Sequence, residues 1–292
     1  MYSIVEKIIS VSHIGEFSLQ LIFANLAIFF SIALLEILVN DWRGSALYRI
    51  IYKRSKSTTG DLWCWFLSIF KLYDFFSLTF SIGLFYVLSA LLYHTIQEQH
   101  LILLIPNVFL QFFILFVISD FKHFVWHYFM HRRPFWQLHK YHHSAEEFNL
   151  ITTSRGHFIE TSVLTIFDAL VFLVFGLPLE DYLFFLYFRE TYSHLLHSNL
   201  QWHFGWIGQY IFLSPIGHRI HHSKDPKHFN KNYGSVFVWW DRLFGTFFYT
   251  KEPIEIGVEP NEYNKNGFWK DMFFGAKSFL KDSHTLVFRR SK

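Results

Sequence analysis

The sequence predicts an all-α integral membrane protein with about four transmembrane or half-membrane helical elements and a histidine-lined cap on the cytoplasmic side. Hydrophobic residues make up 52% of the 292 residues and charged residues only 17%, whereas soluble domains carry about 25% charged residues. Apolar segments of the length needed to enter a bilayer recur between residues 20 and 188. Histidines stand in groups beside these segments, three and four residues apart. These three observations together predict the class.

The first predicted membrane helix covers residues 20–39, an apolar segment long enough to span a bilayer. The preceding residues 1–19 lack the basic start, apolar run and small-residue cleavage site of a secretory signal. Five basic side chains follow the helix, and an excess of Lys and Arg marks the cytoplasmic side of a membrane protein. They are Arg43, Arg49, Lys53, Arg54 and Lys56.

Two further predicted spans cover residues 75–93 and 101–119, with Pro106 near the outer end of the second. The link between them, HTIQEQH, contains neither Lys nor Arg. Residues 1–119 therefore form a predicted transmembrane region that ends on the cytoplasmic side. This count places Asp120 and the first histidines on the same side as the basic segment.

A shorter apolar stretch at residues 161–188 is interrupted near Gly176 and Pro178. Each half is too short to span a bilayer comfortably. We expect two half-depth helices, or one shallow hairpin, that enter and leave on the same side. Asp168 is the one clear carboxylate in this stretch, and the sequence indicates no partner for it. This hairpin falls within a predicted domain of residues 120–250, and residues 251–292 form a predicted cytoplasmic C-terminal tail.

The histidine spacing is that of residues sharing one face of a helix. Neutral imidazole is a common ligand of zinc, copper and iron, and a buried imidazole without a partner costs roughly 1 to 3 kcal/mol. We therefore predict that the clustered histidines bind metal. These are His127, His131, His139, His142, His143, His194, His197, His218, His221 and His222. His123, one turn before His127, is either a further ligand or a residue at the membrane interface. His157 is a candidate either for binding metal or for holding a ligand imidazole in place.

This number of histidines exceeds the four to six ligands of a single ion and indicates two ions close together, which can activate a small molecule between them. No carboxylate lies within the clusters, unlike the Glu-rich sites of helix-bundle di-iron proteins. Cys64 is the single cysteine, which excludes a disulfide framework and an internal iron–sulfur or cysteine–zinc site. The net charge of +3 is too small to indicate nucleic-acid binding.

Motifs across about residues 115–250 resemble the fatty acid hydroxylase/sterol desaturase superfamily, and one segment resembles its alkylglycerol monooxygenase-like members. That segment is HHSAEEFNLITTSR. Tyr128 stands where the family commonly has Arg. The motifs are DF at 120–121, His127 with His131, LHKYHHS at 138–144, TTSRGH at 152–157, HSN at 197–199, PIGHRIHHS at 215–223, NYG at 232–234 and WDRLFGTF at 240–247.

The resemblance implies a membrane di-iron oxygenase that uses dioxygen and two electrons to hydroxylate or desaturate a C–H bond of a lipid. It assigns the metals to the clustered histidines other than His194, and the reaction needs no acid or base apart from these ligands. It makes Asn232 and Asp241 residues that hold a ligand imidazole in place or form part of the cap. Sterol, fatty acyl, sphingoid, ether-lipid and carotenoid substrates all remain open. The working metal is expected to be iron, two ions per chain, because zinc has no redox chemistry. Zinc can nevertheless replace iron in purified protein, because it binds nitrogen sites more tightly.

The electrons are expected from a separate protein, because one cysteine cannot hold an iron–sulfur cluster and no dinucleotide fingerprint is present. A ferredoxin, a rubredoxin or a b-type cytochrome with its reductase would serve. Lys224, Lys227 and Lys231 offer either a basic docking patch for it or a contact with anionic lipid headgroups. The alternative function is a histidine-rich membrane metal transporter or metal-binding protein, and a third is a structural membrane protein that has lost activity. Transport sites usually lie near the bilayer centre, whereas these histidines flank the predicted spans.

Overall fold

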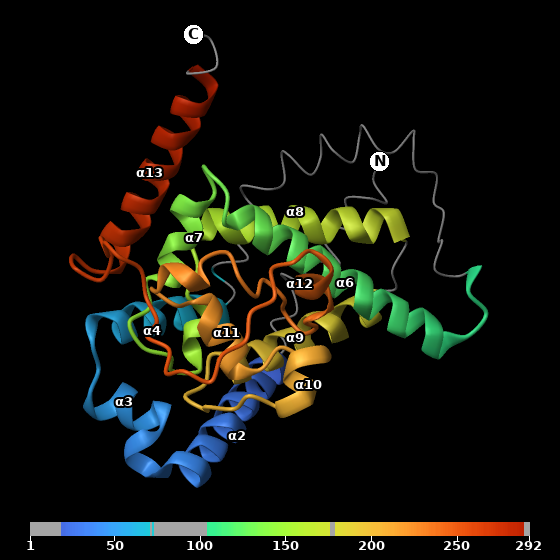
Figure 1. Ribbon diagram of the computed structural model, residues 1–292, viewed down its shortest axis with the longest axis horizontal. Helices are drawn as coiled ribbons and strands as arrows, with labels where there is room; N and C mark the ends of the chain where they lie inside the picture. The colour runs from blue at the N-terminus through green and yellow to red at the C-terminus, as the bar shows by residue number, and fades with distance from the viewer. Residues whose placement is uncertain (1–18, 71, 73–103, 176–178, 289–292) are drawn as a thin grey trace.

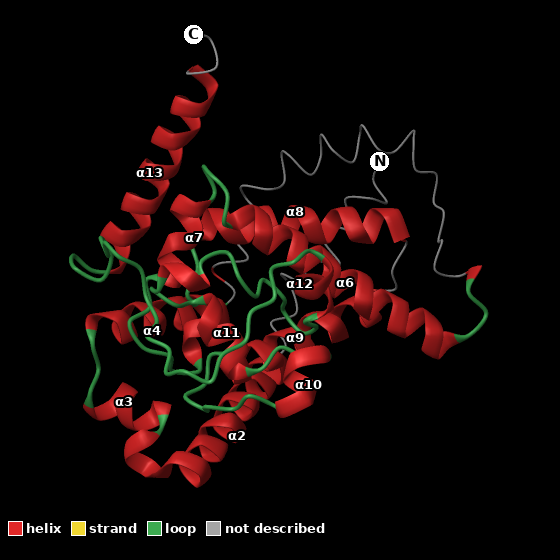
Figure 2. Ribbon diagram, in the orientation of Figure 1, coloured by secondary structure: helices red, strands yellow, loops and turns green. Residues whose placement is uncertain are grey.

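The computed structural model describes residues 19–70, 72, 104–175 and 179–288, and within these ranges the fold is helical (Figures 1 and 2). No strand occurs in them; two isolated bridges join Phe212 to Phe237 and Ser223 to Ile256. The predicted all-α class is confirmed for this part of the chain. The helices are α2 (Leu19–Gly44), α3 (Ala46–Tyr52), α4 (Lys56–Ile69), α6 (Val108–Met130), α7 (Trp136–His143), α8 (Phe158–Phe175), α9 (Leu179–Leu196), α10 (Gly205–Tyr210), α11 (Pro215–His221), α12 (Trp239–Leu243) and α13 (Phe268–Phe288).

Helix α2 contains the first predicted span and is tied to later parts of the chain by a buried carboxylate. Glu36 is fully buried and accepts hydrogen bonds from the backbone N–H groups of Ala46 and Asn199, both at 2.6 Å. These contacts join α2 to the start of α3 and to the segment after α9. The predicted span at residues 75–93 lies outside the described residues.

Helix α6 departs from the predicted span at residues 101–119. It begins at Val108, where the side chain of Asn107 accepts a hydrogen bond from the N–H of Leu110, and it continues to Met130. Asp120 does not end the helix, because its carboxylate accepts hydrogen bonds from the backbone N–H groups of Val236 and Phe237. Among the described residues, α6 is the one helix long and apolar enough to cross a membrane. The apolar segment and the first histidines therefore share one continuous helix.

Helices α8 and α9, each of 18 residues, occupy the stretch predicted as a hairpin. Helix α8 packs against α6, and α9 packs against α2 and α11. Asp168 of α8 forms a buried ion pair with Lys122 of α6. The prediction that Asp168 lacks a partner is therefore wrong, because the packing of α6 on α8 brings together two charges that are far apart in the sequence.

Arg155 joins α4 to the segment that precedes α13. Its fully buried guanidinium pairs with Asp61 of α4 at 2.8 Å and donates to Asn264 at 2.5 Å. The predicted C-terminal tail contains helix α13, which packs on α7 and α4 and then projects away from the body (Figure 1). Asp271 and Met272 of α13 are buried in this contact.

Candidate metal centre

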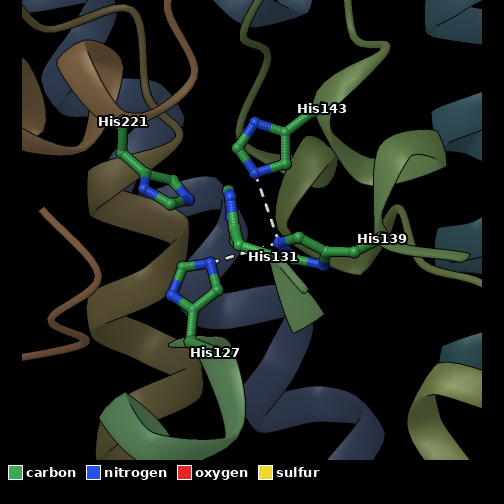
Figure 3. A group of neighbouring side chains, drawn as sticks. All are labelled: His127, His131, His139, His143 and His221. Atoms are coloured by element: carbon green, nitrogen blue, oxygen red, sulfur yellow. Dashed lines mark hydrogen bonds between the residues drawn. The ribbon is translucent and has the colours of Figure 1, made fainter. Parts of the chain in front are cut away.

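Nine histidines form two adjoining groups. Within each group, one ring nitrogen of every member lies within 4.8 Å of the others. The first group consists of His127, His131, His139, His143 and His221. Figure 3 shows all five, with dashed lines that join a nitrogen of His139 to His127 and to His143. The second group consists of His142, His197, His218 and His222.

Each H-x-x-H-H triplet contributes to both groups. In the triplet that ends α7, His139 and His143 enter the first group and His142 enters the second. In the triplet of α11, His221 enters the first group, whereas His218 and His222 enter the second. The spacing predicted only that the members of a triplet share one face of a helix. The structure shows that each triplet is divided between two neighbouring groups.

Four of the nine imidazoles are oriented by backbone carbonyl groups. The Nδ1 atom of His127 donates to the carbonyl of Tyr233 at 2.8 Å, and the Nδ1 atom of His142 donates to the backbone carbonyl of Arg155 at 2.7 Å. The Nδ1 atoms of His197 and His221 donate to the carbonyls of Ser193 and Lys231, at 2.8 and 2.7 Å. A proton held on Nδ1 leaves the lone pair on Nε2, which is the atom available to a metal.

A carboxylate that the sequence analysis missed orients a fifth imidazole. Glu160, in the first turn of α8, accepts a hydrogen bond from Nδ1 of His139 at 2.6 Å. Such a contact fixes the tautomer of a ligand imidazole and raises its basicity. The only sequence signal was an acidic residue at the start of an apolar helix, and nothing in the sequence indicated that this helix lies beside α7.

The arrangement of the nitrogen atoms fits bound cations. His127 and His139 both carry their proton on Nδ1, so the two Nε2 lone pairs face each other at 3.2 Å. Two lone pairs at this distance repel, and a cation between them converts the repulsion into two attractions. In addition, Nε2 of His131, His221 and His222 is buried without a hydrogen-bond partner. The five imidazoles of the first group therefore fit one metal ion, and the four imidazoles of the second group fit another.

Burial also keeps these imidazoles neutral. Loss of hydration lowers the pKa of His139 and His142 to about 3, and it lowers the pKa of His143, His221 and His222 well below the ordinary histidine value. A protonated imidazole cannot bind a metal, so a neutral ring is the form that ligation requires.

Three predicted histidines lie outside both groups. The Nδ1 atom of His194 donates to the carbonyl of Leu150 at 2.8 Å. The Nε2 atom of His157 donates to the carbonyl of Met272 at 2.8 Å, which ties α13 to the start of α8. His123 is also outside the groups, with its ring centroid 6.0 Å from that of His127.

Asp241 and Asn232 form hydrogen bonds with backbone groups, and Asp241 also with one hydroxyl, but with none of the nine imidazoles. Asp241 accepts hydrogen bonds from the N–H groups of Tyr233 and Gly234, both at 2.7 Å, and from the Thr246 hydroxyl at 2.6 Å. Because the Tyr233 carbonyl accepts from His127, Asp241 acts on the first group through this turn of backbone. Asn232 joins α11 to the following segment by donating to the carbonyl of Gly217 at 3.0 Å.

The predicted basic patch is largely neutralised. Lys224 pairs with Glu255 at 2.8 Å and with Glu259 at 3.2 Å. Lys227 pairs with Glu252 at 2.8 Å. Carboxylates from residues 252–259, which fold back against this segment, offset the charge that the local sequence suggested.

Residues 112–246 match the family model described as fatty acid hydroxylase. This part of the chain is a fatty acid hydroxylase domain. The match agrees with the resemblance seen across about residues 115–250, which is confirmed. The domain contains all nine histidines of the two groups, together with Glu160 and Asp241. The segments that precede and follow it supply supporting contacts, such as that of Asp61 with Arg155.

The fatty acid hydroxylase domain is similar to that of several curated proteins. Alkylglycerol monooxygenase of Caenorhabditis elegans is 33% identical over 174 residues, which are 56% of this chain and 34% of the relative. The human alkylglycerol monooxygenase is 32% identical over 143 residues, 48% of this chain and 31% of the relative. Ornithine lipid hydroxylase OlsE of Rhizobium tropici is 33% identical over 145 residues, which are 49% of this chain and 44% of the relative. The chain thus spans about a third of the alkylglycerol monooxygenases that it matches. No solved structure matches it with significance.

Proposed function

We propose that this protein is a membrane-bound di-iron oxygenase that hydroxylates, or desaturates, a C–H bond of a lipid with dioxygen and externally supplied electrons. The observation that carries the proposal is the pair of adjoining imidazole groups inside a fatty acid hydroxylase domain. The relatives are named as monooxygenases and hydroxylases, which are oxidoreductases. In hydroxylation, one oxygen atom of dioxygen enters the C–H bond, and the other leaves as water with two electrons and two protons.

The two groups are the proposed ligand sets of two ions. Iron bound there would supply the redox chemistry that activates dioxygen, which zinc would not. The ligands, five for one ion and four for the other, are His127, His131, His139, His143 and His221, and His142, His197, His218 and His222. His194 stays outside this set, since its ring nitrogens belong to neither group.

The surrounding side chains orient the ligands and exclude water. Glu160 holds His139, and the turn at Tyr233 holds His127. Aromatic rings cover both groups: the centroid of Tyr233 lies 4.9 Å from that of His131, and Phe148 lies 4.9 Å from His222. An enclosed site of this kind limits side reactions with water.

Membrane attachment follows from α6, whose apolar part leads directly to His127. We propose the division foreseen from the sequence, with a transmembrane region at 1–119, a catalytic domain at 120–250 and a C-terminal segment at 251–292. The basic residues 43–56 support a cytoplasmic active site. A lipid substrate would approach from the bilayer. A separate ferredoxin, rubredoxin or b-type cytochrome with its reductase would deliver the electrons.

Transport of metal is the less favoured function. Asp168, the carboxylate that a transport path would use, is neutralised by Lys122. The five orientation contacts of the imidazoles hold them in fixed directions, which suits a resident metal centre better than a passing ion.

Mass spectrometry of lipid extracts tests the proposed function. Membranes containing the iron-loaded protein, dioxygen and a reducing system are compared with membranes containing His139→Ala or the control His284→Ala, an exposed histidine of α13. We expect a lipid that gains one oxygen or loses two hydrogens with the wild type and the control only. Identical lipid profiles for the iron-loaded wild type and His139→Ala would contradict the proposal.

A further inference from the structure

Three polar side chains between α6 and α9 have buried nitrogen atoms without hydrogen-bond partners. They are His123 (Nδ1), Trp126 (Nε1) and Arg189 (Nη1), and we refer to them as the donor cluster. Buried polar atoms in native proteins nearly always have a partner, which is protein, water or ligand. The donor cluster is separate from the nine proposed ligands, and the proposed function does not use it.

The donor cluster lies beside the first group, on the side of the apolar part of α6. The ring centroids of His123 and Trp126 are 4.9 Å apart, and the Trp126 centroid is 6.0 Å from that of His139. The charge of Arg189 interacts with both His123 and Lys122. His123 and Trp126 therefore place hydrogen-bond donors next to the centre, and Arg189 of the neighbouring helix α9 adds a positive charge that acts on His123.

The charge of Arg189 acts on the Asp120 carboxylate, but within the described residues the two side chains form no ion pair. Asp168 is paired with Lys122. Asp120 accepts hydrogen bonds from the N–H groups of Val236 and Phe237 and from the indole of Trp240. Within residues 104–175 and 179–288, Arg189 forms no ion pair, so a ligand with negative charge would satisfy it.

Aromatic side chains of the same two helices lie next to the donor cluster, along the apolar part of α6. Phe116 lies against Phe185 and Phe188, with ring centroids 5.5 and 5.2 Å apart, and Phe185 is almost completely buried. A hydrocarbon chain suits these aromatic side chains, and an anionic oxygen suits the donors. A lipid with one charged end combines both features.

We propose that His123, Trp126 and Arg189 bind the anionic polar group of the lipid substrate, a carboxylate or a phosphate. This inference rests on the proposed function. Guanidinium pairs with both groups through parallel hydrogen bonds, and the indole and imidazole N–H groups each add one. His123 stands one helical turn before His127, about 6 Å along the axis. The carbon that reacts therefore lies a few bonds from the polar group rather than at the far end of the chain.

Native mass spectrometry of the purified full chain, loaded with zinc so that no turnover occurs, tests the proposal with three lipids of equal chain length. The lipids are a fatty acid, a lysophosphatidic acid and an uncharged monoalkylglycerol. We expect at least one anionic lipid to bind tenfold or more tightly than the uncharged one, and the two anionic lipids distinguish carboxylate from phosphate. Arg189→Gln should abolish this preference, whereas Arg133→Gln, at an exposed arginine, should keep it. Equal binding of all three lipids, or an unchanged preference in Arg189→Gln, overturns the proposal.

Thermal unfolding of Trp126→Phe separates a ligand-binding role from a structural one. The indole N–H has no protein partner, so its removal breaks no hydrogen bond within the protein. The lipid-free variant should lose only the stability that a smaller ring costs at this buried position, while the rise in unfolding temperature caused by the anionic lipid should shrink. A variant destabilised equally with and without lipid contradicts the proposal. The two hypotheses fail separately: lipid oxidation without anion preference rejects only this inference, and anion-selective binding by an iron-loaded protein that oxidises no lipid rejects only the oxygenase function.

Discussion

The imidazole rings of His143 and His222 are stacked, with their centroids 4.2 Å apart and their planes 17° from parallel. His143 belongs to the first group and His222 to the second. This contact is where α7 meets the end of α11, and it makes the two groups immediate neighbours. Convergence of the two triplets was expected from their shared spacing, and the structure confirms it.

The division into two groups predicts which ion each ligand holds. His139→Ala should remove the ion of the first group and His218→Ala that of the second, so each variant should keep about one ion of the about two expected for a two-metal site. Metal analysis of purified protein measures this, with His284→Ala as the matched control. If either variant keeps the full metal content, the assignment of that residue is incorrect.

Glu160 should tune the first group without binding metal. Glu160→Gln keeps an oxygen that can accept from His139 but removes the charge, and we expect a loss of about tenfold or more in metal affinity. Competition with a chelator measures the affinity. Glu190→Gln, at a half-exposed carboxylate 3.7 Å from His194, serves as the control and should behave as wild type. Equal affinities for both variants would show that the contact with His139 has no effect on the metal.

Asp241 should contribute to stability through the turn at Tyr233. Asp241→Ala leaves the N–H groups of Tyr233 and Gly234 without their acceptor, at a cost of about 2 to 4 kcal/mol. Denaturant unfolding measures the change, and Glu259→Ala, an exposed carboxylate, should change stability little. Because the turn also positions His127, the variant should lose metal from the first group before the second. Simultaneous loss from both groups would contradict this order.

Substitution of both Lys122 and Asp168 by apolar residues should preserve stability, whereas substitution of one of them should not. Lys122→Met alone leaves the partly buried carboxylate of Asp168 without its partner and should destabilise the protein by up to about 3 kcal/mol. The double variant Lys122→Met with Asp168→Leu should recover most of this stability and should retain lipid oxidation. If the stable double variant is inactive, the pair has a functional role beyond packing α8 on α6.

Turnover should require a separate electron carrier. Purified iron-loaded protein given lipid, dioxygen and a nicotinamide reductant alone should be inactive, and a ferredoxin or b-type cytochrome with its reductase should restore activity. Sustained turnover without a carrier would refute this requirement. Because Lys224 and Lys227 are already paired with carboxylates, reversal of their charge should reduce the rate only a few-fold, and less so at high salt.

The sequence by itself determined the chemistry of the site. Histidines three and four residues apart share a helix face whatever the surrounding fold, because the helical repeat is a local property. The grouping of histidines on helix faces was therefore predictable. The helical class followed from the apolar segments, and the motifs themselves carried the resemblance to fatty acid hydroxylases. Helix α6 was predicted only approximately, since an acidic residue inside an apolar helix resembles an end until its distant partners are known.

The tertiary structure decided how these residues are grouped and which side chains support them. The spacing within a triplet is compatible with one centre or two, and only the approach of α11 to α7 divides it. The contacts of Glu160 with His139, of Asp168 with Lys122 and of Asp241 with the Tyr233 turn join residues on different elements. His194 has the same local spacing as a ligand, yet the packing of α9 leaves its ring outside both groups. Hydrogen bonds and ion pairs of this kind depend on the packing of whole helices, which no short segment of sequence specifies.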